Sequence, residues 1–436
     1  MAETSQLHAM AQGLDRDQRL VLDIAVDYAK KLKISKSSNV FMAVVAPLLA
    51  VQGGAGSGKS RVIDVMSQMV EKILRTAGDH PDHPYVLKTA FTGTAAANIK
   101  GGTLSSSFRF PFGNKFSSLV EKTRDEWRTL LENLTILCID EMSMVKSDML
   151  YQLHLRLKEV KQQDKLFGGV CVLLFGDVLQ LQPVKATFIF AKPICTDYHP
   201  SYMIRSLWRQ FEVVLLRTNH RQGADREYAD ILNRVRTADM TAEDIAVLQT
   251  RIRPSGHPDI PAGTLVVTKT NAVVNEINAR ALSAIDSQLY EFQASNRSSR
   301  GEVKPYTDRA GCIRNTSLQA VLKLKIGAKV MMTANVDVSD MLTNGSFGVV
   351  VGFDFNPAGK VRYVLVEFAE EDAGKERRKN FTALQSNYPD RRITPVEMYE
   401  KSYTRTNNNN TVNSMTAVQF PLRVSTDFFT KSRFVS

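Results

Sequence analysis

The sequence predicts an α/β fold in which mainly parallel sheets form two domains. Residues 47–51 are an apolar run that leads through a glycine-rich loop into a helical pattern at residues 62–73. Residues 134–141 and 170–177 are two further apolar runs, and each ends at an acidic side chain. Hydrophobic residues make up 43% of the 436 residues, which is enough for packed cores.

The glycine-rich loop at residues 52–60 reads QGGAGSGKS and fits the pattern G-x-x-x-x-G-K-[S/T]. Glycines let backbone N–H groups surround a phosphate, and the following helix directs its positive end at the anion. We expect Lys59 to reach the β- and γ-phosphates and the Ser60 hydroxyl to bind Mg²⁺. The pattern therefore predicts a nucleoside-triphosphate site. Its residues are Gly53, Gly54, Ala55, Gly56, Ser57, Gly58, Lys59 and Ser60.

Further polar residues follow the other predicted strands. Asp140 can hold the water shell of Mg²⁺, and Glu141 can orient and deprotonate an attacking water. Gln180 follows the strand that ends at residue 177, where an amide could sense the γ-phosphate. Arg221 follows a short strand predicted at residues 212–216 and could contact the γ-phosphate as a finger; a solvated arginine is the alternative.

The charge balance favours a polyanionic partner, because the formal net charge is +11. A protein that is basic for solubility alone is the alternative. Residues 101–112 read GGTLSSSFRFPF, and aromatic rings beside a cation suit stacking on single-stranded bases. A segment that is partly buried in the core and partly a loop would also have this composition. The small hydroxyl residues at 92–96 suit close approach to a ligand backbone, or an ordinary strand-to-helix turn.

A zinc site built from cysteine and histidine, disulfides and a membrane span are not expected. The apolar stretch at residues 40–51 is too short to cross a membrane. Cys195 with His199, or His80 with His83, lacks further ligands at zinc spacing. The cysteines form no CxxC pair, so buried thiols are expected. They are Cys138, Cys171, Cys195 and Cys312.

Taken in order, these motifs resemble the petite-integration-frequency DNA helicases of superfamily one over about residues 14–424. IDE and GDVLQLQPV resemble the second and third helicase motifs, and NHRQ at residues 219–222 resembles the arginine-finger motif. FGGV at residues 167–170 matches the sequence before the GD strand. LKIGAKVMMTANVD and NGSFGVVVGF resemble parts of the second motor domain.

The resemblance implies a P-loop NTPase fold with two RecA-like domains and ATP and Mg²⁺ bound between them. It also implies a monomer that couples ATP hydrolysis to 5′→3′ movement on single-stranded DNA, and that acts on DNA junctions in repair, recombination and telomere maintenance. The nucleus or mitochondrion is the expected compartment. Gln18 is similar to the family's adenine-reading glutamine, although a surface glutamine is the simpler interpretation. The implied DNA-contacting residues are Thr92, Gly93, Thr94, Thr103, Phe108, Phe110 and Asn271.

The predicted first motor domain spans residues 1–216, with a strand-separating insertion at about 103–130. The second spans residues 217–436, with a small β-barrel insertion at about 352–416. Its short runs at residues 328–333, 348–353 and 361–368 are rich in β-branched residues.

The sequence departs from the family in two places. Ser105 stands where many members have histidine, and the residues after 424 do not match the family's last motifs, including a second arginine. A relic that binds ATP and single strands without efficient unwinding is therefore one alternative. A P-loop ATPase that acts on protein is another. Stimulation of ATP hydrolysis by single-stranded DNA separates the three.

Overall fold

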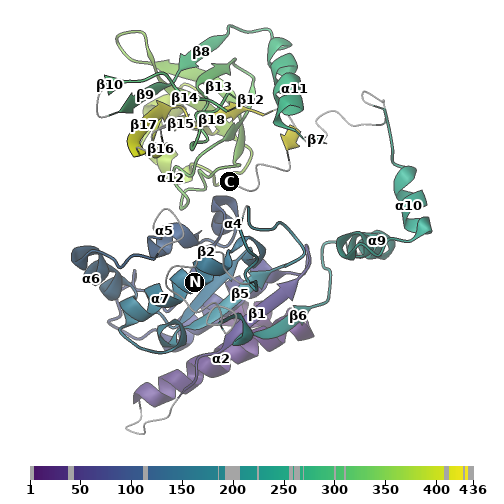
Figure 1. Cartoon of the computed structure of the whole chain (residues 1–436), viewed down its shortest axis with the longest axis vertical. Helices are drawn as coiled ribbons and strands as arrows, with labels where there is room; N and C mark the ends of the chain where they lie inside the picture. The colour runs from purple at the N-terminus through teal and green to yellow at the C-terminus, as the bar shows by residue number, and fades with distance from the viewer. Residues whose placement is uncertain are drawn as a thin grey trace. The chain divides into compact units, whose positions relative to one another are not determined.

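A computed structural model describes most of the chain (Figure 1). The described residues are 4–37, 44–110, 116–184, 186–191, 207–222, 225–254, 259, 266–268, 270–298, 301–308, 311–406, 412–425 and 428–430. The chain divides into two compact units, Met1–Ile252 and Arg253–Ser436. The predicted motor-domain boundary at residue 216 falls inside the first unit, because the helices after residue 225 group with that unit. The division into motor domains stays a prediction.

A six-stranded sheet forms the centre of the first unit, and all of its strands are parallel. The order is β3-β2-β4-β5-β1-β6, so Val51 of the buried strand β1 pairs with Phe175 of β5 on one side and Val214 of β6 on the other. This sheet confirms the α/β prediction for the first unit. The strands are β1 (Leu48–Gly53), β2 (Val86–Ala90), β3 (Gly102–Thr103), β4 (Ile136–Asp140), β5 (Cys171–Gly176) and β6 (Glu212–Leu216).

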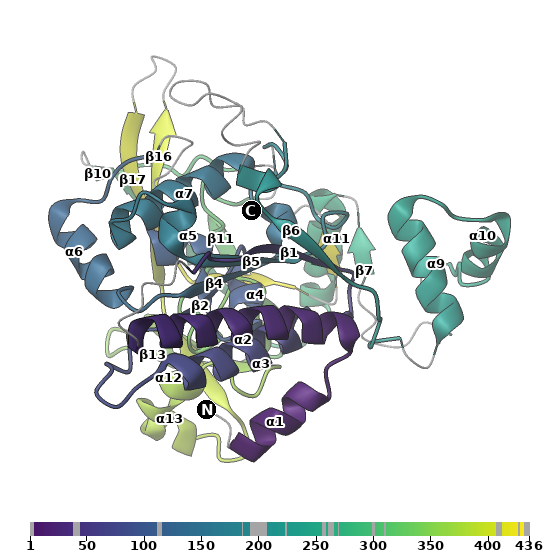
Figure 2. The same cartoon turned by 90° about the horizontal axis from the view of Figure 1, so that it is seen from below.

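Helices cover both faces of this sheet, as parallel strands require. Figure 2 shows the sheet lying between α2 and α3 on one side and α7 on the other. The face toward α7 packs Leu137, Ile139 and Leu174 against Leu150 and Leu153 of that helix. The helices are α1 (Thr4–Gln12), α2 (Arg16–Ser37), α3 (Lys59–Leu74), α4 (Gly93–Asn98), α5 (Leu104–Phe108), α6 (Glu121–Leu130), α7 (Ser147–Lys161), α9 (Arg226–Thr237) and α10 (Ala242–Gln249), with short 3₁₀ turns at Met142–Met144 and Leu166–Gly169.

The second unit is mainly β. It contains α11 (Asn271–Ser283), α12 (Lys375–Lys379) and α13 (Thr382–Ser386). Its strands are β7 (Val266–Thr268), β8 (Tyr290–Gln293), β9 (Ser295–Ser298), β10 (Gly301–Glu302), β11 (Val321–Leu324), β12 (Lys329–Met332), β13 (Phe347–Phe355), β14 (Val361–Phe368), β15 (Ile393–Val396), β16 (Tyr399–Thr406), β17 (Val412–Gln419), β18 (Leu422–Val424) and β19 (Phe428–Thr430).

The strand pairing in the second unit differs from the expected parallel sheet. Within the described residues only β7 and β19 pair in parallel. The five-stranded sheet β15-β14-β13-β12-β18 and the four-stranded sheet β10-β9-β17-β16 are antiparallel. The reason is that short turns join successive strands such as β13 and β14, and a short turn can connect only antiparallel neighbours.

Two expectations about cysteines and metals can be compared with the structure. Cys138, Cys171 and Cys312 are buried thiols, as predicted, and Cys195 and His199 lie outside the described residues. The rings of His80 and His83 lie 4.6 Å apart between centroids. No group of three potential metal-binding side chains occurs in the part of the chain that the structure describes. In the same part, no helix has both the length and the apolar character needed to cross a bilayer.

Candidate nucleotide and nucleic-acid site

The glycine-rich loop joins the carboxyl end of β1 to the amino end of α3. Gly56 and Gly58 adopt positive φ angles of 82° and 76°, which only glycine adopts at low cost. A Cβ atom on Gly53 would lie 2.4 Å from the Ser57 Oγ. The Lys59 ammonium donates to the carbonyl oxygens of Gly53 and Gly54 at 2.8 and 3.0 Å. The loop is therefore a close-fitting cradle of backbone groups, and the Lys59 ammonium is bonded to its first two carbonyl oxygens.

Two carboxyl groups from the end of β4 act on this lysine electrostatically. Burial lowers the pKa of Lys59, and the charges of Asp140 and Glu141 oppose that shift. Burial raises the pKa of Asp140, and burial together with the Asp140 charge raises the pKa of Glu141. Asp140 Oδ1 accepts a hydrogen bond from the Glu141 N–H at 2.9 Å. Glu141 has a left-handed backbone, with φ 59° and ψ 44°, a strained conformation that is concentrated at functional sites.

The sequence reasoning missed a buried ionic network at the end of β5. Asp177 is fully buried and accepts hydrogen bonds from Arg236 Nε of α9 at 2.6 Å and from Gln52 Nε2 at 2.8 Å. The Gln180 N–H donates to the Asp177 carbonyl oxygen at 2.9 Å, so the turn containing Gln180 starts from this network. A GD pair at a strand end was the available signal for Asp177. The pairing with Arg236 had no sequence signal.

The segment after β6 lies on the phosphate loop. The His220 N–H donates to the Gly56 carbonyl oxygen at 2.8 Å, and a Cβ atom on Gly56 would lie 2.6 Å from the Arg221 Cβ. Asn219 Oδ1 accepts from the N–H groups of Arg221 and Gln222 and so stabilises the turn. The structure therefore brings Arg221, Lys59 and the loop together, as the sequence predicts.

Gln18, the first polar residue of α2 to face this loop, is 1% exposed, so the surface-glutamine alternative is wrong. Its Nε2 donates to the Ser57 carbonyl oxygen at 3.0 Å and lies 3.1 Å from His220 Nε2. Its Oε1 accepts from the Asp15 N–H at 3.1 Å. The amide thus links the amino end of α2 to the loop and to residue 220.

Four of the residues expected to contact DNA lie where β2 and β3 end and α4 and α5 begin. Thr92 and Thr103 follow β2 and end β3, and their hydroxyl groups cap α4 and α5 by accepting from the N–H groups of Ala95 and Ser106. Gly93 is buried and Thr94 is exposed at the start of α4. They share the sheet edge that carries the phosphate loop, because all six strands are parallel.

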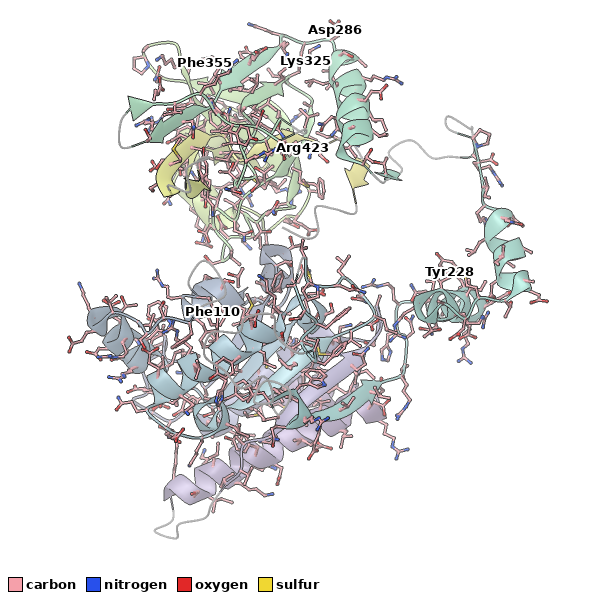
Figure 3. All side chains as sticks on the ribbon, viewed as in Figure 1. Phe110, Tyr228, Asp286, Lys325, Phe355 and Arg423 are labelled. Carbon is pink, nitrogen blue, oxygen red and sulfur yellow. The ribbon has the colours of Figure 1, made fainter. Side chains whose placement is uncertain are left out.

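The expectation that Phe108 stacks on bases is corrected. Phe108 is 0% exposed and packs in the core with Leu104 and Leu131, because it lies on the inner face of α5. Phe110, two residues after the end of α5 (Figure 3), is partly buried against the same cluster, and its ring stacks on Phe108 with 6.1 Å between centroids. Asn271 begins α11, and its side chain lies outside the described part.

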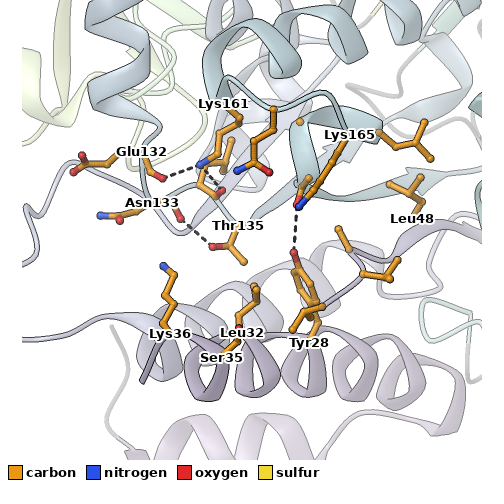
Figure 4. A pocket seen from close by; sticks show the side chains of 18 residues that line it. Tyr28, Leu32, Ser35, Lys36, Leu48, Glu132, Asn133, Thr135, Lys161 and Lys165 are labelled. Atoms are coloured by element: carbon orange, nitrogen blue, oxygen red, sulfur yellow. Dashed lines mark hydrogen bonds between the residues drawn. The ribbon is translucent and has the colours of Figure 1, made fainter. Parts of the chain in front are cut away.

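A separate cavity of about 700 Å³ lies at the opposite edge of the sheet (Figure 4). Leu48 at the start of β1 and Thr135 just before β4 line it, so it faces the amino ends of the strands. Lys161, also in its wall, donates to the carbonyl oxygens of residues 131, 132 and 134. The cavity is therefore distinct from the nucleotide site.

Comparisons with known proteins point to one family. A family model described as PIF1-like helicase matches residues 14–245, and one described as DNA helicase Pif1, 2B domain, matches residues 314–353. The human ATP-dependent DNA helicase PIF1 is 31% identical over 323 residues, which is 72% of this chain and 45% of that protein. The protein of the same name from Emericella nidulans is 26% identical over 386 residues, 84% of this chain and 47% of its own length. The chain thus spans about half the length of these curated relatives.

Solved structures agree on the fold. A crystal structure of Pif1 helicase from Candida albicans covers 96% of this chain and is itself covered to 85%, with a TM-score of 0.64 and 24% identity. A Bacteroides Pif1 structure in complex with ADP-AlF3 and ssDNA covers 92% of this chain and is itself covered to 82%, with a TM-score of 0.60 and 23% identity.

Proposed function

Since this chain belongs to the PIF1-like helicase family, we propose that it hydrolyses ATP and uses the released free energy to move 5′→3′ along single-stranded DNA and to separate duplexes. The observation that carries this proposal is the convergence of five motifs on one edge of a parallel sheet. The phosphate loop, the Asp177 network and residues 219–222 follow β1, β5 and β6. The Asp140–Glu141 pair lies at the end of β4, and the capping residues Thr92 and Thr103 lie at the ends of β2 and β3.

The loop fits a triphosphate. Its four glycines contribute no Cβ atoms to the cradle, and within the described residues the Lys59 ammonium bonds to two backbone oxygens that a phosphate can replace as partners. Ser60, at the start of α3, and Asp140 would hold Mg²⁺, which neutralises developing negative charge on the phosphates. Glu141 would take the proton of the water that attacks the γ-phosphorus, while the bond from the γ-phosphorus to the ADP oxygen breaks. Arg221 would stabilise the charge on the transferring group.

Movement on DNA requires that loss of the γ-phosphate be transmitted to other elements. Gln180 is the candidate sensor, because its turn begins at Asp177, which is bonded to α9 through Arg236. Single-stranded DNA and DNA junctions are the proposed partners, and the net charge of +11 supports a polyanionic ligand. We further propose that the chain acts as a monomer in DNA repair, recombination and telomere maintenance, in the nucleus or mitochondrion.

The test is ATP hydrolysis measured with and without single-stranded DNA, together with unwinding of duplexes that carry a 5′ or a 3′ tail. We expect strong stimulation by single strands and unwinding from the 5′ tail. Lys59→Ala should abolish both activities, since it removes a charge directed at the phosphates. Lys31→Ala is the matched control, because Lys31 is an exposed α2 lysine paired with Asp27. Hydrolysis that is indifferent to DNA would contradict the proposal.

A further inference from the structure

Arg109, which is exposed, and Trp127, which is partly buried, form a pair of a cation and an aromatic ring in the first unit. The guanidinium carbon of Arg109 lies 4.8 Å from the centre of the Trp127 ring. Arg109 terminates α5 and is exposed, whereas Trp127 lies on α6 and is partly buried against the core. The pair therefore joins the carboxyl end of α5 to α6.

The indole is fixed in position. Trp127 Nε1 donates a hydrogen bond to the Ser107 carbonyl oxygen at 2.7 Å, which ties α6 to α5. Arg109 has a left-handed backbone, with φ 48° and ψ 50°, at the end of α5. Non-glycine residues adopt this conformation at some cost, so it is kept where the surrounding structure determines it. Arg109 is exposed, so its side chain is accessible to a ligand.

The charge of Arg109 is not neutralised locally. Among the described residues no carboxylate pairs with it, whereas Arg128 of α6 pairs with Asp125 at 3.1 Å and the buried Arg156 pairs with Glu159 at 2.5 Å. A flat cation that rests on a fixed ring, and that has no anionic partner among the described residues, is suited to a ligand with both a π-face and a nearby negative charge.

We propose that Arg109 and Trp127 form a stacking site for one nucleobase of single-stranded DNA, an inference that rests on the proposed function. Bases stack on guanidinium planes and aromatic rings, and this binding tolerates any sequence because every base has a π-face. The pair lies next to α5, whose capping residue Thr103 ends β3 at the edge that carries the phosphate loop. Unlike Phe108, which is buried, the pair has an exposed planar group, the Arg109 guanidinium, resting on a fixed ring.

A phosphate contact is the competing interpretation of an exposed arginine, and Arg109→Lys separates the two. Lysine keeps the positive charge but lacks the planar guanidinium group. It can therefore replace arginine in a contact with a phosphate, but not in stacking on a base. We expect Arg109→Lys to weaken binding of an oligothymidylate roughly five- to tenfold, with an unchanged slope of log affinity against log salt. Arg362→Lys is the control, because Arg362 lies 4.9 Å from the Tyr363 ring centre in the second unit; its affinity should equal that of the parent.

A second measurement observes the ring directly. The chain has two tryptophans, Trp127 and Trp208, so Trp208→Phe leaves Trp127 as the sole indole reporter. Its fluorescence should be quenched by oligothymidylate in parallel with binding, and less by an oligomer of abasic sugars.

These outcomes separate the two proposals. Parent-like affinity in Arg109→Lys, or equal quenching by the abasic oligomer, would overturn the stacking site while leaving the helicase proposal intact. If the parent chain does not bind single strands at all, the proposed function itself fails.

Discussion

The backbone N–H of His220 donates a hydrogen bond to the carbonyl oxygen of Gly56, with 2.8 Å between nitrogen and oxygen. Because His220 precedes Arg221, this bond fixes the candidate finger residue against the phosphate loop. The His220 ring strengthens the attachment, since its Nε2 lies 2.9 Å from Asp15 Oδ2. The position of the candidate finger residue therefore depends on the conformation of the loop at Gly56.

Gly56→Ala tests this packing. Gly56 has φ 82°, and an added Cβ would lie 2.6 Å from the Arg221 Cβ and 2.7 Å from Asn219 Oδ1. The methyl group should displace residues 219–221, so we expect ATP turnover to fall roughly tenfold or more. Gly78→Ala is the control, because Gly78 also has a positive φ, 99°, but lies outside the phosphate loop and nothing lies within 4 Å of its added Cβ. Steady-state ATPase and thermal unfolding of both variants check this; equal turnover in the two would contradict it.

Arg221→Ala should lower turnover with little effect on ATP affinity. An arginine finger acts on the transition state, and its removal costs roughly 10³-fold or more in rate. Arg217→Ala is the control, since Arg217 is exposed and pairs with Asp17 at 2.9 Å, and such surface pairs contribute little. Single-turnover hydrolysis and nucleotide titration give the two quantities. An effect on affinity alone would show that Arg221 only binds the ground state.

Glu141→Gln should bind ATP but not hydrolyse it. The amide keeps the size of the carboxyl group and loses the capacity to accept the proton of the attacking water. Equilibrium binding of a fluorescent ATP analogue, combined with phosphate release, tests the variant. Loss of ATP binding would instead indicate that Glu141, with its left-handed backbone, has a structural role.

Arg236→Met should destabilise the first unit. Asp177 is fully buried, and removing its guanidinium partner leaves an uncompensated charge, which costs about 3 kcal/mol. Arg280→Met is the control, because it breaks the exposed pair with Glu276 and should cost less than about 1 kcal/mol. Denaturant unfolding of both variants checks the difference. Adding Asp177→Asn to Arg236→Met should recover part of the loss; no recovery would show that packing, not charge, is responsible.

His154 should make stability depend on pH. Its Nδ1 accepts a hydrogen bond from the Phe167 N–H at 3.1 Å, and burial lowers its pKa to about 4. A histidine in the unfolded chain has a pKa of about 6.5, so between that pH and about pH 4 the unfolded chain binds a proton that the folded chain does not. The free energy of unfolding therefore falls by about 1.4 kcal/mol for each unit by which the pH falls in this range. The stabilising effect is therefore complete above pH 6.5 and is lost as the pH falls. His154→Asn keeps an acceptor and does not titrate, so its melting temperature should fall less steeply from pH 6.5 to 5; equal slopes would contradict this.

Local patterns were enough to identify the elements that carry the nucleotide chemistry. The strand predicted at residues 212–216 is β6, and the glycine-rich loop, Asp140 and Glu141 lie at strand ends as predicted. The reason is that strand, turn and helix signals act over a few residues, and the phosphate loop needs glycines at particular backbone angles.

Only the tertiary structure decided the relations between distant segments. The sequence did not distinguish a core Phe108 from a base-stacking one, because the same Ser/Phe/Arg composition serves both, and the choice depends on which side of α5 faces Leu131. It also did not reveal that Asp177 pairs with Arg236 or that His220 lies on Gly56. The Asp177–Arg236 contact spans 59 positions of the sequence and the His220–Gly56 contact spans 164, so no local pattern encodes either. Residues 56 and 220 meet because β1 and β6 are parallel neighbours, whose carboxyl ends lie side by side.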